Sequence, residues 1–177
     1  YRSTLNPLII ASGPNSSLPH AQVTKRKFTN GDMITIDLTL RYKGYVSDAT
    51  RTFGLGSISK EAVTVYEIVK ESQKAGLKAV KPGKTCGSVD DACRKIITEY
   101  NYGSHFIHST GHGIGLDVHE NPNISGKNKE KLKKNMAITV EPGIYIPKKI
   151  GVRIEDSLIV KNRADVMHKF TKDLIII

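Results

Sequence analysis

The sequence predicts an α+β fold, in which antiparallel strand pairs are combined with two central helices. The predicted strand over residues 34–40 alternates apolar and polar side chains, the two-residue period of a half-buried strand. Two later segments, between residues 59 and 97, place apolar side chains at helical spacing. Short strand-like runs return after residue 137. With 177 residues, the chain has the length for one domain with a sizeable core.

The strand over residues 34–40 is the first half of a predicted β-hairpin that carries two carboxylates. A Lys-Gly pair at 43–44 supplies a two-residue turn, with glycine where positive φ is tolerated. Pairing Tyr42 with Tyr45 across this turn makes Asp37 and Asp48 diagonal neighbours on one face, with Cβ atoms about 7 Å apart or less. Carboxylates this close repel each other unless a cation lies between them. A divalent metal site and a surface hairpin with two solvated aspartates are equal alternatives at this point.

The other predicted elements follow in chain order. A short apolar strand over residues 7–12 ends at a Gly-Pro-Asn turn. Ser59 is the expected N-cap of the first helix, which ends before the Pro-Gly pair at 82–83. Its expected buried stripe comprises Val63, Tyr66, Val69, Leu77 and Val80. Thr85 or Ser88 begins the second helix. Further strands are expected at 138–140, 144–146, 152–160 and 174–177.

Composition and charge exclude several classes of protein. The net charge of +10 comes mainly from lysines, five of which lie within residues 127–134. They alternate with Asn, Glu and Leu rather than with arginine and aromatic residues, so a solvated surface loop is expected and nucleic-acid binding is not. The longest apolar runs are strand-length, so no membrane span is expected. The two cysteines match no zinc or redox spacing, and a cytoplasmic location fits them best.

Three further stretches carry side chains that can bind metal. His112 lies in a glycine-rich turn, Glu141 ends an apolar strand, and Glu155 lies on an alternating strand. Each of them alone is more often a structural residue than a ligand. Together with the two hairpin aspartates they form four carboxylates and one imidazole, which suit two divalent ions such as Mn²⁺, Co²⁺ or Fe²⁺ better than one zinc ion.

Simple sequence motifs for other chemistries fail. The His-Glu pair at 119–120 is not part of a zincin helix, because Pro122 breaks any helix and position 123 is Asn. No hydrophobic strand leads directly into the glycine-rich segment 111–115 and no helix follows it, which excludes a dinucleotide-binding loop. Neither a Walker sequence nor a nucleophile elbow is present.

These motifs resemble those of the metallopeptidases with the pita-bread fold, which include methionine aminopeptidases, Xaa-Pro aminopeptidases and Xaa-Pro dipeptidases (prolidases). The resemblance covers nearly all of the chain. It rests on Asp37 with Asp48 eleven residues later, the segment 111–115 around His112, the Glu-Pro-Gly at 141–143 and the Arg-Ile-Glu-Asp at 153–156. It implies a curved antiparallel sheet with helices packed on its outer side.

The resemblance also implies a ligand set and residue roles. The metal ligands would be Asp37, Asp48, His112, Glu141 and Glu155. Asp48 and Glu155 would bridge both ions, Asp37 would hold one, and His112 with Glu141 the other. The ions would be Mn²⁺ or Co²⁺, with Fe²⁺ or Zn²⁺ as alternatives. No family ligand is replaced, which disfavours a metal-free relative.

The remaining roles concern catalysis and substrate. Glu141 would move the proton of the attacking water, and His20 and His119, which match two non-ligand active-site histidines, would bind the substrate carbonyl and the oxyanion. His108 matches a substrate-contacting histidine. Arg153 belongs to the substrate side of the site, where it would orient Asp48 or Glu155 rather than touch substrate.

The implied reaction is the hydrolysis of Xaa-Pro bonds by a hydroxide bridging two divalent metals, as in a prolidase. The segments 141–145 and 151–156 follow the Xaa-Pro branch of the family rather than the methionine aminopeptidases. The partners would be short peptides with proline at the second position, and a second copy in a homodimer of the full-length protein. An Xaa-Pro or methionine aminopeptidase, and a non-catalytic binding module on the same fold, remain alternatives.

The same resemblance assigns residues 1–177 to one metallopeptidase catalytic domain. The sequence begins without an initiator Met. We therefore expect a fragment that lacks the first helices of that domain and the separate N-terminal domain.

Overall fold

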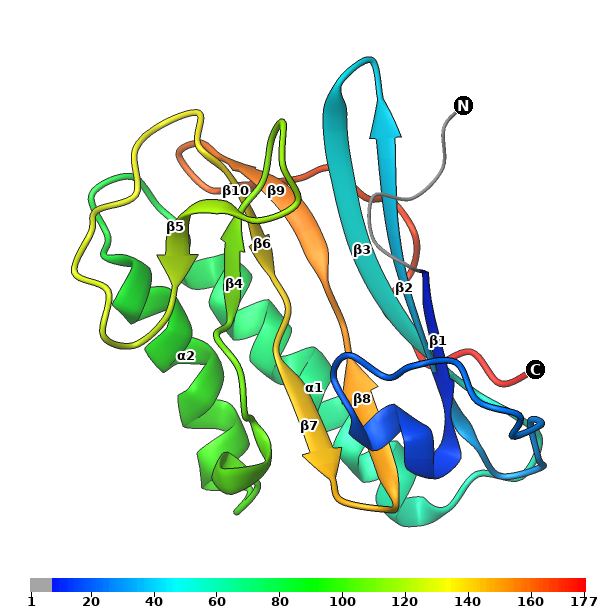
Figure 1. Ribbon diagram of the computed structural model, residues 1–177. Coiled ribbons are helices and arrows are strands. Elements are labelled where there is room, and N and C mark those ends of the chain that lie inside the picture. Colours follow the sequence, from blue (N-terminus) through cyan, green and yellow to red (C-terminus); the bar gives the residue numbers. More distant parts are fainter. Residues whose placement is uncertain (1–7) are drawn as a thin grey trace.

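The computed structural model describes residues 8–177, which form an α+β fold as predicted. Figure 1 shows the β1–β2–β3 sheet on one side of the molecule and the remaining strands on the other, with both α-helices behind them. Two short 3-10 helices, η1 (Gly13–Ser17) and η2 (Gly103–His105), complete the fold. The domain prediction for residues 1–177 begins outside the described residues.

The predicted hairpin forms β2 (Met33–Tyr42) and β3 (Tyr45–Gly54), and β1 (Ile9–Ser12) pairs antiparallel with β2. Its register is the predicted one, since Tyr42 pairs with Tyr45 and Asp37 pairs with Thr50. Lys43 and Gly44 have φ of 49° and 89°, the left-handed pair that a type I′ hairpin turn requires. Residue 7, the predicted start of the first strand, lies outside the described residues.

A five-stranded sheet has the order β10-β9-β6-β4-β5. Its strands are β4 (Gly111–Gly113), β5 (Glu120–Ile124), β6 (Ala137–Val140), β9 (Asp156–Val160) and β10 (Ala164–Val166). A separate two-stranded sheet pairs β7 (Gly143–Ile146) with β8 (Ile150–Arg153). The predicted strand over residues 152–160 is therefore wrong in its continuity, because β8 and β9 are separate strands.

The interruption between the two sheets lies at two of the predicted ligands. Val140 pairs with Asp156 and Gly143 with Arg153, and the same register continued through the gap places Glu141 opposite Glu155. Facing carboxylates repel, so a regular ladder is unfavourable there. Instead, the Glu141 N–H donates to the Thr110 carbonyl at 2.7 Å and the Glu155 N–H to the Thr50 carbonyl at 3.1 Å. The break thus ties this strand pair to β3 on one side and to the segment before β4 on the other.

Helix α1 (Lys60–Ala79) begins after Ser59, whose hydroxyl accepts from the Ala62 N–H as an N-cap. Helix α2 (Cys86–Glu99) begins after Thr85, the first of the two predicted starts. Helix α1 packs against β6, β7 and β8, and α2 packs against α1 and β5; the buried side chains of both helices join one core with Ile138 and Leu158. Val63 is 39% exposed, so its predicted inward position is wrong. The buried stripe of α1 runs instead through Ala62, Val65, Tyr66, Ile68 and Val69.

The predicted strand over residues 174–177 does not form. Ile176 makes a single isolated parallel bridge with Gly54, while the Ile177 N–H donates to the Gly54 carbonyl at 2.9 Å. A few residues earlier, the C-terminal segment meets a buried ion pair between Arg51 and Asp156, at 2.7 Å. Lys172 joins the same Asp156 carboxylate at 2.5 Å. The end of the chain is therefore fixed to the end of β3 by backbone hydrogen bonds and to Asp156 of β9 by a side chain.

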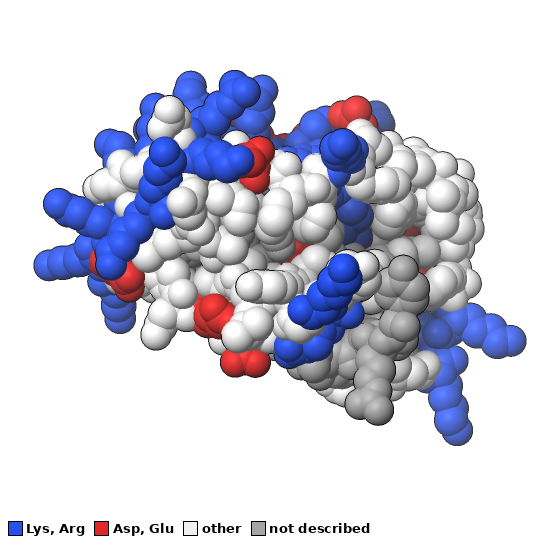
Figure 2. Space-filling view, turned by 90° about the horizontal axis from the view of Figure 1, so that it is seen from above, with Lys and Arg blue, Asp and Glu red and all other residues white. Residues whose placement is uncertain are grey.

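The lysine-rich segment forms an exposed loop, as predicted, anchored by the buried Leu132. Figure 2 shows Lys and Arg side chains crowded at one side of the molecule viewed from above. The lysines of segment 127–134 do not line the cavity described below. In the part of the chain that the structure describes, no helix is long and apolar enough to cross a membrane.

Candidate metal centre

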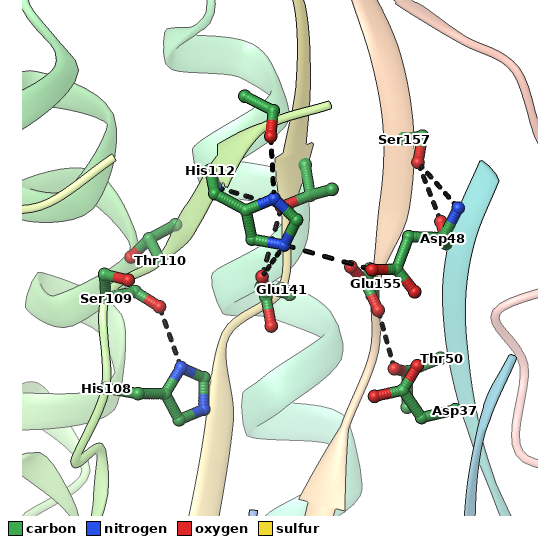
Figure 3. A network of polar contacts seen from close by, with 12 residues as sticks. Asp37, Asp48, Thr50, His108, Ser109, Thr110, His112, Glu141, Glu155 and Ser157 are labelled. Atoms are coloured by element: carbon green, nitrogen blue, oxygen red, sulfur yellow. Dashed lines mark hydrogen bonds and ion pairs between the residues drawn. The ribbon is translucent and has the colours of Figure 1, made fainter. Parts of the chain in front are cut away.

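A cavity of about 920 Å³ lies between the β1–β2–β3 sheet on one side and the five-stranded and two-stranded sheets on the other. All nine sequence-predicted site residues line it. They come from elements distant in the sequence: β2, β3, β4, the break between β6 and β7, the end of β8, and the loops. Figure 3 shows His112 and Glu141 facing Asp48, Glu155 and Asp37 across this space. The lining set comprises Asp37, Asp48, His112, Glu141, Glu155, His20, His108, His119 and Arg153.

Three of the five predicted ligands form a tight cluster. One ligand atom each of Asp48, His112 and Glu155 lies within 4.8 Å of the others. The His112 Nε2 atom is 3.2 Å from Glu141 Oε1 and 3.9 Å from Asp48 Oδ2. Asp37 stands outside this cluster, although it lines the same cavity.

The His112 imidazole is oriented by its backbone contact. Its Nδ1 lies 2.9 Å from the Gly113 carbonyl, which can only accept, so Nδ1 carries a hydrogen. In the neutral ring Nε2 then has a free lone pair, and that lone pair faces carboxylate oxygens. A lone pair directed at carboxylates is repulsive unless a proton or a metal ion lies between them, which is the arrangement of a metal-binding histidine.

Each predicted carboxylate ligand also accepts a hydrogen bond from a neighbouring side chain. Thr39 donates to Asp48 at 3.0 Å, Thr50 to Glu155 at 2.7 Å and Thr139 to Glu141 at 3.1 Å. Arg153 pairs with Asp37 at 2.6 Å. Such contacts orient ligands and are typical of the surroundings of a metal site. Sequence reasoning missed the three threonines, although Thr39 and Thr50 lie opposite Asp48 and Asp37 in the predicted register.

Ser157 fixes the position of Asp48 relative to β9. Its hydroxyl donates to the Asp48 carbonyl at 2.7 Å and accepts from the Asp48 N–H at 3.3 Å (Figure 3). Because β9 follows directly after Glu155, this contact also holds the Asp48 backbone beside Glu155. The sequence gives no signal for it, since β3 and β9 are more than 100 residues apart.

Burial and neighbouring charges shift the pKa values of the carboxyl groups in the site. Burial, followed by the charges of Asp37 and Glu141, raises the pKa of Asp48 to about 7. Burial and then Glu141 and Asp48 hold the pKa of Glu155 well above its usual range. Burial acts in the same direction on Glu141, but the hydrogen bond and charge of a protonated His112, together with the charges of His108 and Arg153, outweigh burial and lower the pKa of Glu141. The pKa values thus show a site in which several carboxylates compete for too little positive charge.

An orphaned atom shows that divalent metal ions fit this site. Glu155 is 1% exposed, and among residues 8–177 its Oε1 atom is buried without a hydrogen-bond partner. A buried unpaired carboxylate oxygen is costly, and a cation bound there would satisfy it. Carboxylate oxygens with one imidazole nitrogen are ligands that divalent ions from Mn²⁺ to Zn²⁺ accept.

The glycines around His112 are required by the close approach of neighbouring backbone. A Cβ atom on Gly111 would lie 2.1 Å from the Thr139 carbonyl oxygen, and one on Gly113 would lie 2.3 Å from that of Asn121. Both contacts are far inside van der Waals distance. The glycines therefore let β4 lie between β5 and β6 and carry His112 into the cavity, as the sequence indicated.

A chain of polar contacts leads from His108 to Asp37. The His108 Nδ1–H donates to the Ser109 carbonyl at 2.7 Å, and Nε2 lies 2.8 Å from the Tyr145 hydroxyl. That hydroxyl also accepts from Arg153 at 2.8 Å, and Arg153 pairs with Asp37. Burial raises the pKa of Tyr145 to about 12, so the phenol stays protonated and donates to His108. Sequence reasoning missed Tyr145, which looks like an ordinary strand residue.

Arg153 acts on different ligands from those expected. It pairs directly with Asp37 rather than with Asp48 or Glu155. It reaches Glu155 only indirectly, because its Nε–H donates at 3.2 Å to Thr50, the residue that bonds Glu155. The expected orienting role is compatible with the geometry, but the proposed ligand that Arg153 contacts directly is Asp37.

The two remaining histidines lie at the exposed side of the cavity. The His119 ring stands edge-on to the His112 ring, with 4.4 Å between ring centres. Burial and the neighbouring His112 lower the pKa of His119. His20 is exposed on the loop that follows η1 and lines the same cavity. Both are placed to meet a molecule that enters from solvent.

Comparison with known proteins identifies the class that this fold and site define. The model of metallopeptidase family M24 matches residues 1–162. This chain belongs to metallopeptidase family M24.

Individual relatives show which members of the family the chain resembles. The chain is 49% identical over 168 residues to the Xaa-Pro dipeptidase of Pyrococcus furiosus, covering 94% of this chain and 48% of the relative. The solved Xaa-Pro dipeptidase from Bacillus anthracis superposes with a TM-score of 0.94 at 46% identity, over 96% of this chain and 48% of that one. The X-Pro aminopeptidase from Thermotoga maritima gives a TM-score of 0.93 at 39% identity, over 96% of this chain and 49% of that one.

The predicted pita-bread fold is confirmed by the match to the solved prolidases. The chain spans about half the length of the curated relatives that it matches.

Proposed function

We propose that this chain is the metal-binding part of an exopeptidase that hydrolyses Xaa-Pro peptide bonds with two divalent metal ions. The observation that carries the proposal is the cluster of Asp48, His112 and Glu155 within 4.8 Å, with one Glu155 oxygen buried and unpaired among residues 8–177. The Xaa-Pro dipeptidases among its relatives support the choice of substrate. An intracellular location is part of the proposal and is supported by two buried cysteines without a disulfide.

The proposed ligands are the five residues already named, with Asp48 and Glu155 shared between the two ions, Asp37 on one ion, and His112 and Glu141 on the other. Mn²⁺ or Co²⁺ is the proposed metal, because the donors are mostly carboxylate oxygens. When bound, such ions polarise a carbonyl group and lower the pKa of water enough to supply a nucleophile near neutral pH.

Glu141 is the proposed proton carrier. Its carboxylate lies in the cavity, 3.2 Å from His112, where it would accept a proton from the attacking water. The same carboxyl group then delivers that proton to the proline nitrogen as the peptide bond breaks, which returns Glu141 to its starting state. His119 and His20, at the open side of the cavity, donate to the substrate carbonyl and to the oxygen that gains charge.

His108 and Arg153 form the proposed inner wall of the substrate pocket. Their shared contact with Tyr145 fixes both side chains relative to Asp37. The partners of the full-length protein would be peptides with proline at the second position and a second copy of the same chain in a homodimer. A dipeptidase is favoured over an aminopeptidase because identity to two Xaa-Pro dipeptidases is 49% and 48%, against 44% to a putative Xaa-Pro aminopeptidase of Mycoplasma genitalium.

Hydrolysis by the full-length protein tests this proposal. Three substrates are compared with Mn²⁺ or Co²⁺ added: an Xaa-Pro dipeptide, a longer Xaa-Pro peptide and a Met-peptide. The dipeptide should be cleaved fastest, and a chelator should abolish cleavage until metal is restored. Cleavage of the Met-peptide alone would overturn the proposed substrate, and preference for the longer peptide would indicate an aminopeptidase.

Asp48→Asn should abolish metal-dependent hydrolysis while the domain stays folded. Asp165→Asn is the matched control, because Asp165 lies on β10, pairs at the surface with Lys161 alone among the described residues, and is absent from the cavity wall. Full activity of Asp48→Asn after chelation and metal restoration would contradict the assignment of Asp48.

A further inference from the structure

Helix α2 carries an ion pair that forms hydrogen bonds with the segment before β4. The Asp90 carboxylate is fully buried and pairs with Arg94, one turn later, at 2.6 Å. Neither residue lines the cavity. Both nevertheless bond to residues 106–110, the segment that ends at β4 and carries His108.

Asp90 holds Thr110, which in turn holds Glu141. Its Oδ1 atom accepts from the Thr110 hydroxyl at 2.8 Å and from the Thr110 N–H at 3.1 Å. The Thr110 carbonyl accepts the Glu141 N–H at 2.7 Å, in the break between β6 and β7. Helix α2 is thus connected to the backbone of a predicted metal ligand through one buried residue.

Arg94 holds the two ends of the turn before His108. One guanidinium nitrogen donates to the Phe106 carbonyl at 2.8 Å and the other terminal nitrogen donates to the His108 carbonyl. The guanidinium plane also lies over the Phe106 ring, 4.1 Å from its centre. The Phe106 ring stands edge-on against the His108 ring, with 5.2 Å between ring centres. The guanidinium therefore fixes both the backbone and one side of the imidazole.

From these contacts we infer that Asp90 and Arg94 are positioning residues, which set the place of His108 in the substrate pocket from outside the cavity. This inference rests on the proposed function for its catalytic consequence, but not for the anchoring itself. Only a planar fork can reach two carbonyls and stack on a ring at once, so lysine cannot replace Arg94 in this role.

Hydrogen–deuterium exchange of the full-length protein tests the anchoring without turnover. In Arg94→Met, amides of residues 106–110 should exchange about tenfold faster or more, while those of β6 and β9 keep their wild-type rates. Arg94→Lys retains the charge beside Asp90 and should exchange as fast as Arg94→Met. Lys95→Met is the matched control for loss of a charge on the same helix, since Lys95 is exposed and, within residues 8–177, pairs only with Glu99. Wild-type exchange of residues 106–110 in both Arg94 variants would overturn the inference.

A double-mutant cycle tests the catalytic consequence. Arg94→Met should lower kcat/KM for the Xaa-Pro dipeptide by about 10- to 100-fold, a range expected for a displaced binding group. In a His108→Ala background the same change should lower it by less than about twofold, because the group that Arg94 positions is already gone. If Arg94→Met lowers kcat/KM by the same factor in the wild type and in the His108→Ala background, Arg94 acts independently of His108, which would contradict the inference. If Arg94→Met fails to fold, Arg94→Lys takes its place in the cycle.

The two proposals fail in different ways. An inactive wild-type protein would count against the proposed function alone, and the exchange rates would still decide whether α2 anchors the segment. An active wild-type protein with unchanged exchange in the variants would refute the positioning role alone.

Discussion

The replacement Glu155→Gln separates two effects on the free energy of unfolding: the loss caused by the crowded carboxylates without metal, and the gain when metal binds. Glu155 is buried between β3 and β9, where Thr50 bonds one carboxylate oxygen at 2.7 Å and the other oxygen has no partner among the described residues. Its neighbours Glu141 and Asp48 add to the effect of burial in raising its pKa. Glutamine has the same shape and no charge: its carbonyl still accepts from Thr50, and its NH2 group takes the place of the unpaired oxygen, where the neighbouring Asp48 carboxylate can accept from it.

The magnitude follows from the unpaired oxygen and the crowded charges. An unsatisfied buried acceptor costs about 1–3 kcal/mol, and a charged one costs more. We therefore expect the metal-free Glu155→Gln variant to have a free energy of unfolding about 1–3 kcal/mol higher than the wild type. Metal at 100 times its dissociation constant should add about 2.7 kcal/mol to the wild type. The variant should gain little, so metal should shift the stability difference between the two proteins by about 2.7 kcal/mol in favour of the wild type.

Urea unfolding at pH 8, with a chelator and then with Mn²⁺, measures both quantities. Glu130→Gln, in the exposed lysine-rich loop, is the control and should leave both values within about 0.5 kcal/mol of the wild type. The reasoning would be refuted by a Glu155→Gln variant that is less stable than the wild type without metal. Equal stabilisation of the two proteins by Mn²⁺ would refute it as well.

Three further predictions concern other parts of the structure. Gly111→Ala should destabilise the fold by about 2 kcal/mol or more, because the new Cβ meets the Thr139 carbonyl; urea unfolding measures it, and a loss below about 0.5 kcal/mol would contradict it. Burial raises the pKa of Asp32, but hydrogen bonds from Arg26 and Thr29 together outweigh burial and lower the pKa overall, so the ionised Asp32 stabilises the fold above the ordinary carboxyl range and this contribution is lost as pH falls through the lowered value. The stability difference between the wild type and Arg26→Met should therefore shrink below about pH 3.9, and a difference that grows there would have the wrong sign. Tyr145→Phe removes the hydroxyl that joins two cavity residues and should lower kcat/KM about tenfold at unchanged metal stoichiometry, which steady-state kinetics and metal analysis would check.

Local sequence patterns were sufficient for the hairpin and the helix starts. A two-residue turn fixes the register of its strands, so the pairing of Asp37 with Thr50 followed from Lys43 and Gly44 alone. The N-cap Ser59 was likewise readable, because its hydroxyl bonds within the same turn of helix, whereas Thr85 was one of two predicted starts of the second helix.

Contacts between distant segments were not readable in this way. The position of Glu141 opposite Glu155 depends on how β6 pairs with β9, which no short pattern fixes. Asp90 and Arg94 have the spacing of an ordinary surface ion pair on a helix, and only the packing of α2 against residues 106–110 shows their other partners.

The errors have the same origin. The apolar run 174–177 reads as a strand, but only one of its residues bridges to the end of β3. Val63 fits a helical apolar stripe by spacing, yet the face of α1 that meets the sheet is centred on its neighbours and leaves Val63 at the surface. Hydrophobicity shows that a side chain can be buried, but the partner element decides whether it is.

The central claim is that five residues from both halves of the chain form a single site for two metal ions. Calorimetric titration of the chelator-treated, full-length protein with Mn²⁺ tests it most directly. The account predicts saturation at two ions per chain in the wild type, and loss of high-affinity binding in Asp48→Asn, whose carboxylate is proposed to serve both ions. An absence of saturable binding in the wild type, or unchanged binding of two ions by Asp48→Asn, would contradict it.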